Sequence, residues 1–156
     1  MKVGIGQDSH RIDYINKNKK LILAGIEFEE NFSLLANSDG DVILHAITNA
    51  ISGVTCKNIL GNISDKMCNK KGIKNSEEYL KEALKYLNEP ITHISVSIEC
   101  KVPKINPKIE IMRKNIARIL NINENHVGIT ATSGEELTEF GKGNGINVFA
   151  CITVGF

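Results

Sequence analysis

The sequence predicts an α+β protein of two layers, a mixed β-sheet covered on one face by three helices. Residues 93–101, H-I-S-V-S-I-E-C-K, alternate between apolar and polar side chains, which is typical of a strand with one buried face. Three other segments repeat apolar residues at helical spacing, and a helix with one apolar stripe buries it against a sheet. The segments follow one another roughly in the order β-β-α-α-β-α-β-β.

Length and composition indicate one globular domain over residues 1–156, since 42% hydrophobic and 24% charged residues are ordinary values. The formal net charge of +1 gives no argument for binding nucleic acid or an acidic membrane. Strand pattern begins at once and no apolar run approaches about 18 residues, so we expect neither a signal or transit peptide nor a membrane helix. The cysteines form no C-x-x-C pair, which favours reduced thiols and a cytoplasmic location: Cys56, Cys68, Cys100 and Cys151.

The first strand is predicted in residues 2–11, K-V-G-I-G-Q-D-S-H-R. Val3 and Ile5 alternate with glycines, as in a short buried strand. Asp8 and His10 are two residues apart, and in an extended segment such residues point to the same side. A carboxylate and an imidazole are therefore expected to converge at the end of this strand. After a polar turn, residues 20–29 indicate a strand or a hairpin broken at Gly25.

Residues 36–51, A-N-S-D-G-D-V-I-L-H-A-I-T-N-A-I, predict a helix that runs to about Gly53. Ser38 suits the N-cap, and Asp41 stands at capping-box spacing from it. The apolar stripe consists of Ile43, Ile47, Ala50 and Val54. His45 lies off this stripe and one turn after Asp41, so we expect the Asp41 carboxylate to orient the histidine ring.

Asp8, His10 and His45 together make a set of two histidines and one carboxylate. Three protein ligands with an open fourth position are typical of catalytic zinc. The competing interpretation is that His45 is an ordinary surface or core histidine, which is the commoner case for a single histidine on a helix.

The second half of the chain alternates between helices and strands. Residues 55–75 lack a sustained period and are predicted as a long loop, of the kind that serves as a lid or is disordered. Asn75 or Ser76 caps a helix that Pro90 ends. Asn106 and Pro107 open a third helix, with a buried stripe at Ile109, Met112, Ile116 and Ile119 or Leu120. Residues 126–132 predict a strand, and residues 146–154 predict a central strand, apolar on both sides.

Four motifs follow one another along the chain: G-I-G-Q-D-S-H-R, S-D-G-D-V-I-L-H-A, P-K-I-N-P and A-T-S-G-E-E-L-T-E-F-G-K-G-N-G-I. In their order and nearly in their spacings they resemble the 2-C-methyl-D-erythritol 2,4-cyclodiphosphate synthase family of the non-mevalonate isoprenoid pathway. The resemblance covers essentially the whole chain. It implies a two-layer fold and a homotrimer with active sites between neighbouring subunits.

The resemblance also implies the reaction and its metals. The 2-phosphate of 4-diphosphocytidyl-2-C-methyl-D-erythritol 2-phosphate attacks the β-phosphorus, CMP leaves and a cyclic diphosphate forms. Asp8, His10 and His45 match the zinc ligands of the family, and Glu135 matches its ligand for a second cation, Mg²⁺ or Mn²⁺. Without the resemblance, Glu135 has roughly even odds of being a solvated loop carboxylate.

Further positions match the family's substrate-binding residues. Thr132 and Ser133 match paired threonines that contact phosphates, and Asn37 and Ser133 are the candidate catalytic residues. Residues 100–106 match a cytosine pocket, although Pro103 and Lys104 alone would indicate only a strand end and a solvated lysine. The complete substrate-binding set is Asp8, Ser9, His10, Asn37, Ser38, Asn58, Leu60, Gly61, Asp65, Cys100, Pro103, Lys104, Ile105, Asn106, Ala131, Thr132, Ser133, Glu135, Glu139 and Lys142.

Several residues depart from the family pattern. Asn37 replaces a histidine and so keeps hydrogen-bond donors without a positive charge. Asn58 stands where many members have an aspartate that binds erythritol hydroxyls. Glu139 and Lys142 replace a phenylalanine and an arginine beside the trimer axis, where the family has a cavity that can hold isoprenoid diphosphates.

Two alternatives to the synthase remain open. A zinc-dependent hydrolase of a phosphate ester would use the same ligand set to activate water, but the chain has no H-E-x-x-H pattern. A non-catalytic trimeric isoprenoid-phosphate-binding protein would fit the changes at Asn37, Asn58 and Glu139.

Overall fold

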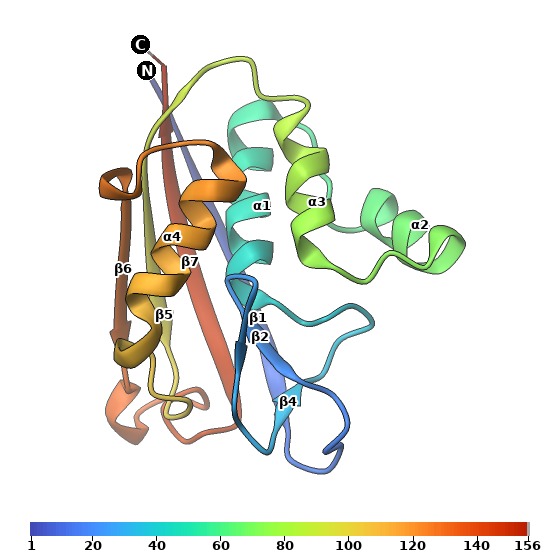
Figure 1. The fold of residues 1–156 in the computed structure, drawn as a ribbon, viewed down its shortest axis with the longest axis vertical. Coiled ribbons are helices and arrows are strands. Elements are labelled where there is room, and N and C mark those ends of the chain that lie inside the picture. Colours follow the sequence, from blue (N-terminus) through green and yellow to red (C-terminus); the bar gives the residue numbers. More distant parts are fainter. Residues whose placement is uncertain (156) are drawn as a thin grey trace.

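A five-stranded mixed sheet forms one layer of the computed structural model, which describes residues 1–155 (Figure 1). Its strands are β1 (Lys2–Asp13), β4 (Ser33–Leu34), β5 (Ile91–Glu99), β6 (Val127–Thr132) and β7 (Gly145–Val154). Their order across the sheet is β4-β1-β7-β5-β6. β5 and β6 are parallel and the other neighbours are antiparallel, which confirms the predicted mixed sheet and the central place of the last strand.

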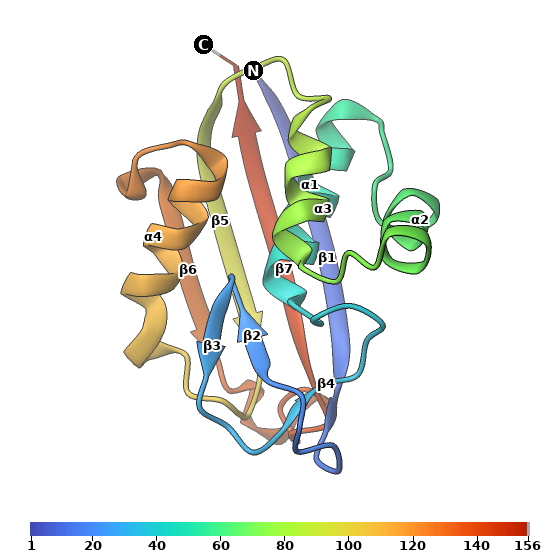
Figure 2. The same ribbon diagram turned by 45° about the vertical axis from the view of Figure 1, so that its right-hand side comes forward.

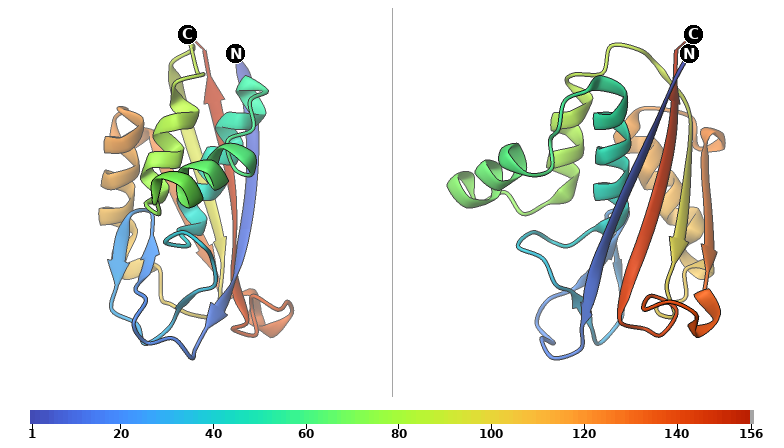
Figure 3. Two further views of the ribbon diagram at one scale, coloured as in Figure 1. Left: turned by 90° about the vertical axis from the view of Figure 1, so that its right-hand side faces the viewer. Right: turned by 180° about the vertical axis from the view of Figure 1, so that it is seen from behind.

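Helices α1 (Val42–Thr55), α3 (Ser76–Leu84) and α4 (Ile109–Leu120) cover one face of this sheet, as predicted (Figures 1 and 3). The predicted stripes are buried in the core between the layers. They include Ile43 and Ile47 of α1, Met112 and Ile116 of α4, and Ile94, Val96 and Ile98 of the facing strand β5.

A fourth helix, α2 (Asn62–Lys71), corrects the prediction of a continuous loop over residues 55–75. It projects away from the sheet beside α1 and α3 (Figure 1). Of its residues only Ser64 is buried, so the segment shows no apolar period in the sequence. Local contacts support the helix instead: Gly72 closes its C-terminus in the left-handed conformation, and Lys70 and Lys71 lie in the last turn, where the helix dipole favours cations.

Residues 20–29 form a hairpin, which agrees with one of the two predicted forms. Strands β2 (Leu21–Leu23) and β3 (Ile26–Phe28) pair antiparallel in a separate two-stranded sheet (Figure 2). Gly25 in the turn has φ of 73°, a conformation that glycine adopts without strain. The backbone of this turn contacts the start of α1, as described below.

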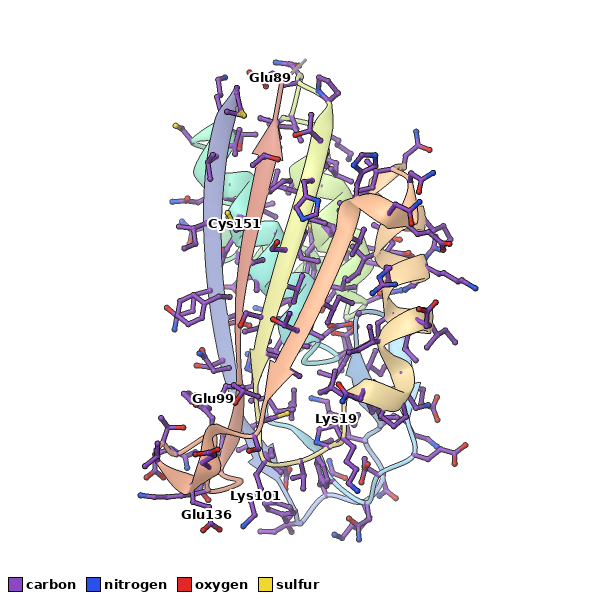
Figure 4. All side chains as sticks on the ribbon, turned by 90° about the vertical axis from the view of Figure 1, so that its left-hand side faces the viewer. Lys19, Glu89, Glu99, Lys101, Glu136 and Cys151 are labelled. Carbon is purple, nitrogen blue, oxygen red and sulfur yellow. The ribbon has the colours of Figure 1, made fainter. Side chains whose placement is uncertain are left out.

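The expectation that Val3 and Ile5 of β1 are buried was wrong. They are 61% and 68% exposed and lie on the face of the sheet opposite the helices, here called the open face. Gly4 and Gly6 point the other way, toward α1, because that helix packs too close to the strand for a side chain. Phe149 of β7, 43% exposed, adds a third apolar side chain to the open face, which Figure 4 shows in front.

The structure of residues 1–155 also bears on the expectations about the cysteines and about membrane helices. All four cysteines lie in this part of the chain and are free thiols. None of the helices that the structure describes is long and apolar enough to cross a membrane.

Candidate active site

Asp8, His10 and His45 come together as predicted, with β1 carrying the first two and α1 the third. Asp8 Oδ2 lies 3.0 Å from His10 Nε2 and 3.1 Å from His45 Nδ1, and the two nitrogens are 3.2 Å apart. Tetrahedral zinc with bonds of about 2.0–2.1 Å separates its ligand atoms by roughly 3.3 Å. The three atoms therefore fit a single zinc ion.

The charge of this cluster also suits a cation. Burial alone would raise the pKa of Asp8, but its interactions with the neighbouring His10 and His45 outweigh it and lower the pKa to about 2. Asp8 is therefore a carboxylate at neutral pH, and it places a negative charge between two imidazoles.

Asp41 does not orient His45, which corrects the expectation from their spacing. Asp41, and not Ser38, is the N-cap of α1, and its carboxylate accepts hydrogen bonds from the N–H groups of Ala24 (2.9 Å), Gly25 (2.6 Å) and Leu44 (3.1 Å). Burial and the nearby charge of Asp39 raise the pKa of Asp41 to about 6. Asp41 thus joins α1 to the β2–β3 turn, and its side-chain hydrogen bonds go to backbone N–H groups and not to the His45 ring.

The outer nitrogen of His45 contacts Ser76 instead, at 2.8 Å from Nε2 to Oγ. Ser76 is the first residue of α3 and is completely buried. The sequence marks it only as a helix start, and its separation of 31 residues from His45 leaves no spacing signal.

A cavity of about 340 Å³ opens beside the cluster, between β1, the start of α1, and α2. Seven predicted site residues line it: Asp8, His10, Asn37, Ser38, His45, Leu60 and Asp65. Sequence reasoning missed Ser64, Cys68 and Tyr79, which α2 and α3 bring to its wall. Asn58 and Gly61 are exposed residues just before α2, on either side of Leu60 in the chain.

The predicted cytosine and phosphate residues form a second group, at the carboxyl ends of β5 and β6. Cys100 N–H donates to Thr132 O at 3.1 Å, which joins the segments 100–106 and 131–135. Figure 4 shows Glu99, Lys101 and Glu136 at this end of the sheet, where Lys101 and Glu136 form an ion pair of 2.9 Å. Pro103 and Ile105 are buried, whereas Lys104, Asn106 and Ala131 are exposed.

Individual side chains of this second group differ in how free they are to bind a ligand. The Cys100 thiol is buried and donates to Pro103 O, and burial followed by the charge of Glu99 raises its pKa to about 12. It is therefore a neutral thiol at pH 7. The Ser133 hydroxyl accepts from Glu135 N–H at 3.4 Å, and the Glu135 carboxylate is exposed in a loop with φ of 48°.

Ser9, Glu139 and Lys142 do not line the 340 Å³ cavity, but Ser9 and Glu139 share another cavity with His10. Ser9 alternates with Asp8 and His10 on β1, so its side chain faces the open side of the sheet and lines a cavity of about 230 Å³ with Glu139. Glu139 accepts from Asn144 Nδ2 at 2.6 Å and from Lys142 Nζ at 3.3 Å, and these contacts lower its pKa.

The second group does not line the 340 Å³ cavity. Residues of the segments 100–106 and 131–135 are absent from its wall as formed by residues 1–155.

The fold and the cluster together define a two-layer α+β protein with two histidines and one aspartate placed so that they could hold a metal ion. The YgbB family model matches residues 1–155. A relative from Chlamydia felis, named 2-C-methyl-D-erythritol 2,4-cyclodiphosphate synthase, is 50% identical over 155 residues, which are 98% of this chain and 88% of that protein. This chain belongs to the YgbB family, with those synthases among its members.

Solved structures agree with this assignment. The IspF protein of Plasmodium falciparum, described as a CDP complex, is 30% identical with a TM-score of 0.83 over 98% of this chain and 94% of that one. The bifunctional IspDF protein of Campylobacter jejuni is 30% identical with a TM-score of 0.87, over 99% of this chain and 42% of that longer chain.

Proposed function

We propose that this protein converts 4-diphosphocytidyl-2-C-methyl-D-erythritol 2-phosphate into 2-C-methyl-D-erythritol 2,4-cyclodiphosphate and CMP, as a phosphorus–oxygen lyase. The observation that carries the proposal is the fit of Asp8, His10 and His45 to one metal ion. The chain that holds them is 50% identical to a relative named 2-C-methyl-D-erythritol 2,4-cyclodiphosphate synthase. An oxygen of the 2-phosphate forms a bond to the β-phosphorus. The bond from that phosphorus to the bridging oxygen breaks, and its electrons leave with CMP.

The protein must bring two anionic phosphates together in line. Asp8, His10 and His45 would hold zinc, which supplies positive charge and polarises a phosphate oxygen. Asn37 can donate hydrogen bonds to phosphate oxygens from the wall of the same cavity, and Asp65 can accept from the erythritol hydroxyls. Because Asn37 carries no charge, its contribution to neutralising the phosphates is smaller than that of a protonated histidine.

We further propose a homotrimer, with each site completed by the second group of a neighbouring chain. The segments 100–106 and 131–135 would then receive cytosine and phosphate opposite the metal cavity, and Glu135 would hold a second cation, Mg²⁺ or Mn²⁺. Two observations support this arrangement. Residues 100–106 and 131–135 do not line the 340 Å³ cavity of the described chain, and the open face exposes Val3, Ile5 and Phe149, which a second copy can cover.

Incubation of the purified protein with the substrate, zinc and Mg²⁺ tests the proposal through its products. CMP together with the cyclic diphosphate supports the synthase. Inorganic phosphate would instead identify a hydrolase, and substrate binding without turnover would identify a binding protein. Sedimentation in the same buffer tests the trimer separately.

A further inference from the structure

The contact between His45 and Ser76 is part of a longer chain of hydrogen bonds. Ser76 Oγ lies 2.8 Å from His45 Nε2, and the same hydroxyl donates to Asp39 Oδ1. His45 is 7% exposed and Ser76 is 0% exposed, so water has little access to these contacts. The chain His45–Ser76–Asp39 leads away from the side of the ring that faces Asp8 and His10.

The direction of these hydrogen bonds follows from the donors around Asp39. Its Oδ2 accepts from Ser76 N–H at 2.9 Å, and its Oδ1 accepts from Asp41 N–H at 3.0 Å. Backbone N–H groups can only donate, so both carboxylate oxygens of Asp39 act as acceptors. The single hydroxyl proton of Ser76 then goes to Asp39, and Ser76 Oγ accepts from His45. His45 therefore carries its proton on Nε2.

The other nitrogen of the ring is left with a free lone pair. A neutral imidazole protonated at Nε2 is an acceptor at Nδ1. His45 Nδ1 is the atom that lies 3.1 Å from Asp8 Oδ2 and 3.2 Å from His10 Nε2. The tautomer set by Ser76 is thus the one that can bind a cation in the cluster.

We propose that Ser76 and Asp39 are positioning residues of the metal centre, which hold His45 in the Nε2–H tautomer with Nδ1 directed at Asp8 and His10. This inference rests on the metal site of the proposed function. It deepens that proposal, because it adds two residues that touch neither metal nor substrate and that come from different segments of the chain.

The backbone holds this arrangement in place. Asp39 N–H donates to Lys74 O at 2.9 Å, so the loop before α1 is fastened to the segment that enters α3. The His45 ring also packs edge-on against His10, with 5.4 Å between centroids, and lies 6.1 Å from the Tyr79 ring. The orientation of the ring is therefore restricted from several sides before any cation binds.

Zinc affinity, measured by competition with a chromophoric chelator, tests the inference without reference to turnover. Removal of an outer partner of a ligating histidine typically weakens metal binding by about 10–100-fold, and we expect this loss for Ser76→Ala. Ser76→Thr keeps a hydroxyl and should bind zinc close to wild type. The matched control is Ser52→Ala, which removes a buried hydroxyl of α1 that has no hydrogen-bond partner among residues 1–155.

The ¹⁵N NMR signals of the His45 ring in the zinc-loaded wild type give a second readout. We expect a slowly exchanging proton on Nε2 and a metal-bound Nδ1. A proton on Nδ1 would overturn the inference, and this measurement decides the matter even if Ser76→Ala does not fold.

The failures of the two proposals are distinguishable. If wild-type protein binds no zinc, the metal site of the proposed function is refuted, and so is the positioning role of Ser76 and Asp39. If wild type binds zinc and Ser76→Ala binds it equally well, only the positioning role is overturned. Equal losses in Ser76→Ala and Ser52→Ala would also overturn it, because they indicate general loosening of α1.

Discussion

Gly6 of β1 lies against the backbone of Ala46 in α1. A Cβ atom at Gly6 would be 2.0 Å from Ala46 O and 2.3 Å from Ala50 N, so strand and helix approach to a distance that no side chain permits. Asp8 and His10 follow Gly6 on the strand, and His45 precedes Ala46 on the helix. This close approach therefore sets the distance between the metal ligands.

Gly6→Ala should separate α1 from β1 and weaken both the fold and the metal site. Both close contacts are with backbone atoms, which cannot rotate away, so we expect a loss of about 3 kcal/mol in the free energy of unfolding. Zinc affinity should fall as well, because His45 moves with α1. Urea unfolding and a zinc titration of the folded fraction measure the two effects.

Gly128→Ala is the control for this substitution. Gly128 also lies in a strand, β6, but a Cβ there meets its nearest atoms at 3.8 Å, an ordinary contact. We expect little change in stability or zinc affinity. Comparable losses in the two variants would show that alanine in a strand, and not the approach to α1, is responsible.

Much of the candidate metal site can be predicted from local spacing in the sequence. The parts that cannot be predicted depend on contacts between residues far apart in the chain. Asp8 and His10 share a face because strands have a period of two, and His45 lies off a helical stripe. Ser76 could not be found this way, because only packing of α3 against α1 brings it to the ring. Asp41 was assigned to His45 from a spacing of four, but its carboxylate reaches backbone N–H groups of the β2–β3 turn.

The fold shows the same division between local and long-range information. The alternation in β5 and the stripe of α4 mark their buried faces because these elements pack on one side, whereas α1 is buried nearly all round and its stripe marks only part of the buried surface. In β1 the sequence pattern does not mark the buried side. The apolar residues Val3 and Ile5 face outward, and the residues that contact α1 are the glycines Gly4 and Gly6, which have no side chain. In the same way α2 has almost no buried side, so its sequence lacks a period.

The buried carboxyl group of Asp41 should make stability depend on pH. Burial and the charge of Asp39 raise its pKa from 3.8 to about 6. The folded state thus favours the protonated form, and this contribution is fully present below pH 3.8 and lost as the pH rises through 6. Its size is about 3 kcal/mol by linkage, as an order of magnitude.

Asp41→Asn isolates this effect, since the amide does not titrate. The difference in unfolding free energy between wild type and variant should shift against wild type as the pH rises from 4 to 7, by urea unfolding of metal-free protein. Groups that do not interact with Asp41 contribute equally to both proteins and cancel in the difference. A difference that stays constant across this range would contradict the assignment.

His45→Ala should abolish stoichiometric zinc binding while the protein remains folded. The substitution removes one of three candidate ligands, and His45, although buried, is not part of the hydrophobic core cluster. Metal analysis after dialysis should find about one zinc per chain in wild type and little in the variant. His126→Ala is the control, because His126 is exposed in the turn before β6 and is not in the cluster. Unchanged zinc content in His45→Ala would remove His45 from the site.

Glu135→Gln should reduce turnover and leave zinc bound, if Glu135 holds the second cation. The substitution preserves shape and removes the charge that a hard cation such as Mg²⁺ requires. We expect a decrease of roughly 100-fold in kcat at limiting Mg²⁺, equivalent to about 2.7 kcal/mol in the barrier, with partial recovery at high Mg²⁺.

The neighbouring Glu136 supplies the control for this last substitution. Both carboxylates are exposed in the same 3-10 turn, but Glu136 is paired with Lys101 at 2.9 Å, whereas Glu135 is our candidate for the cation. Glu136→Gln should therefore turn over at nearly the wild-type rate across the Mg²⁺ titration. If instead the two variants respond alike, the loop acts through its total negative charge, and Glu135 has no specific role as a ligand.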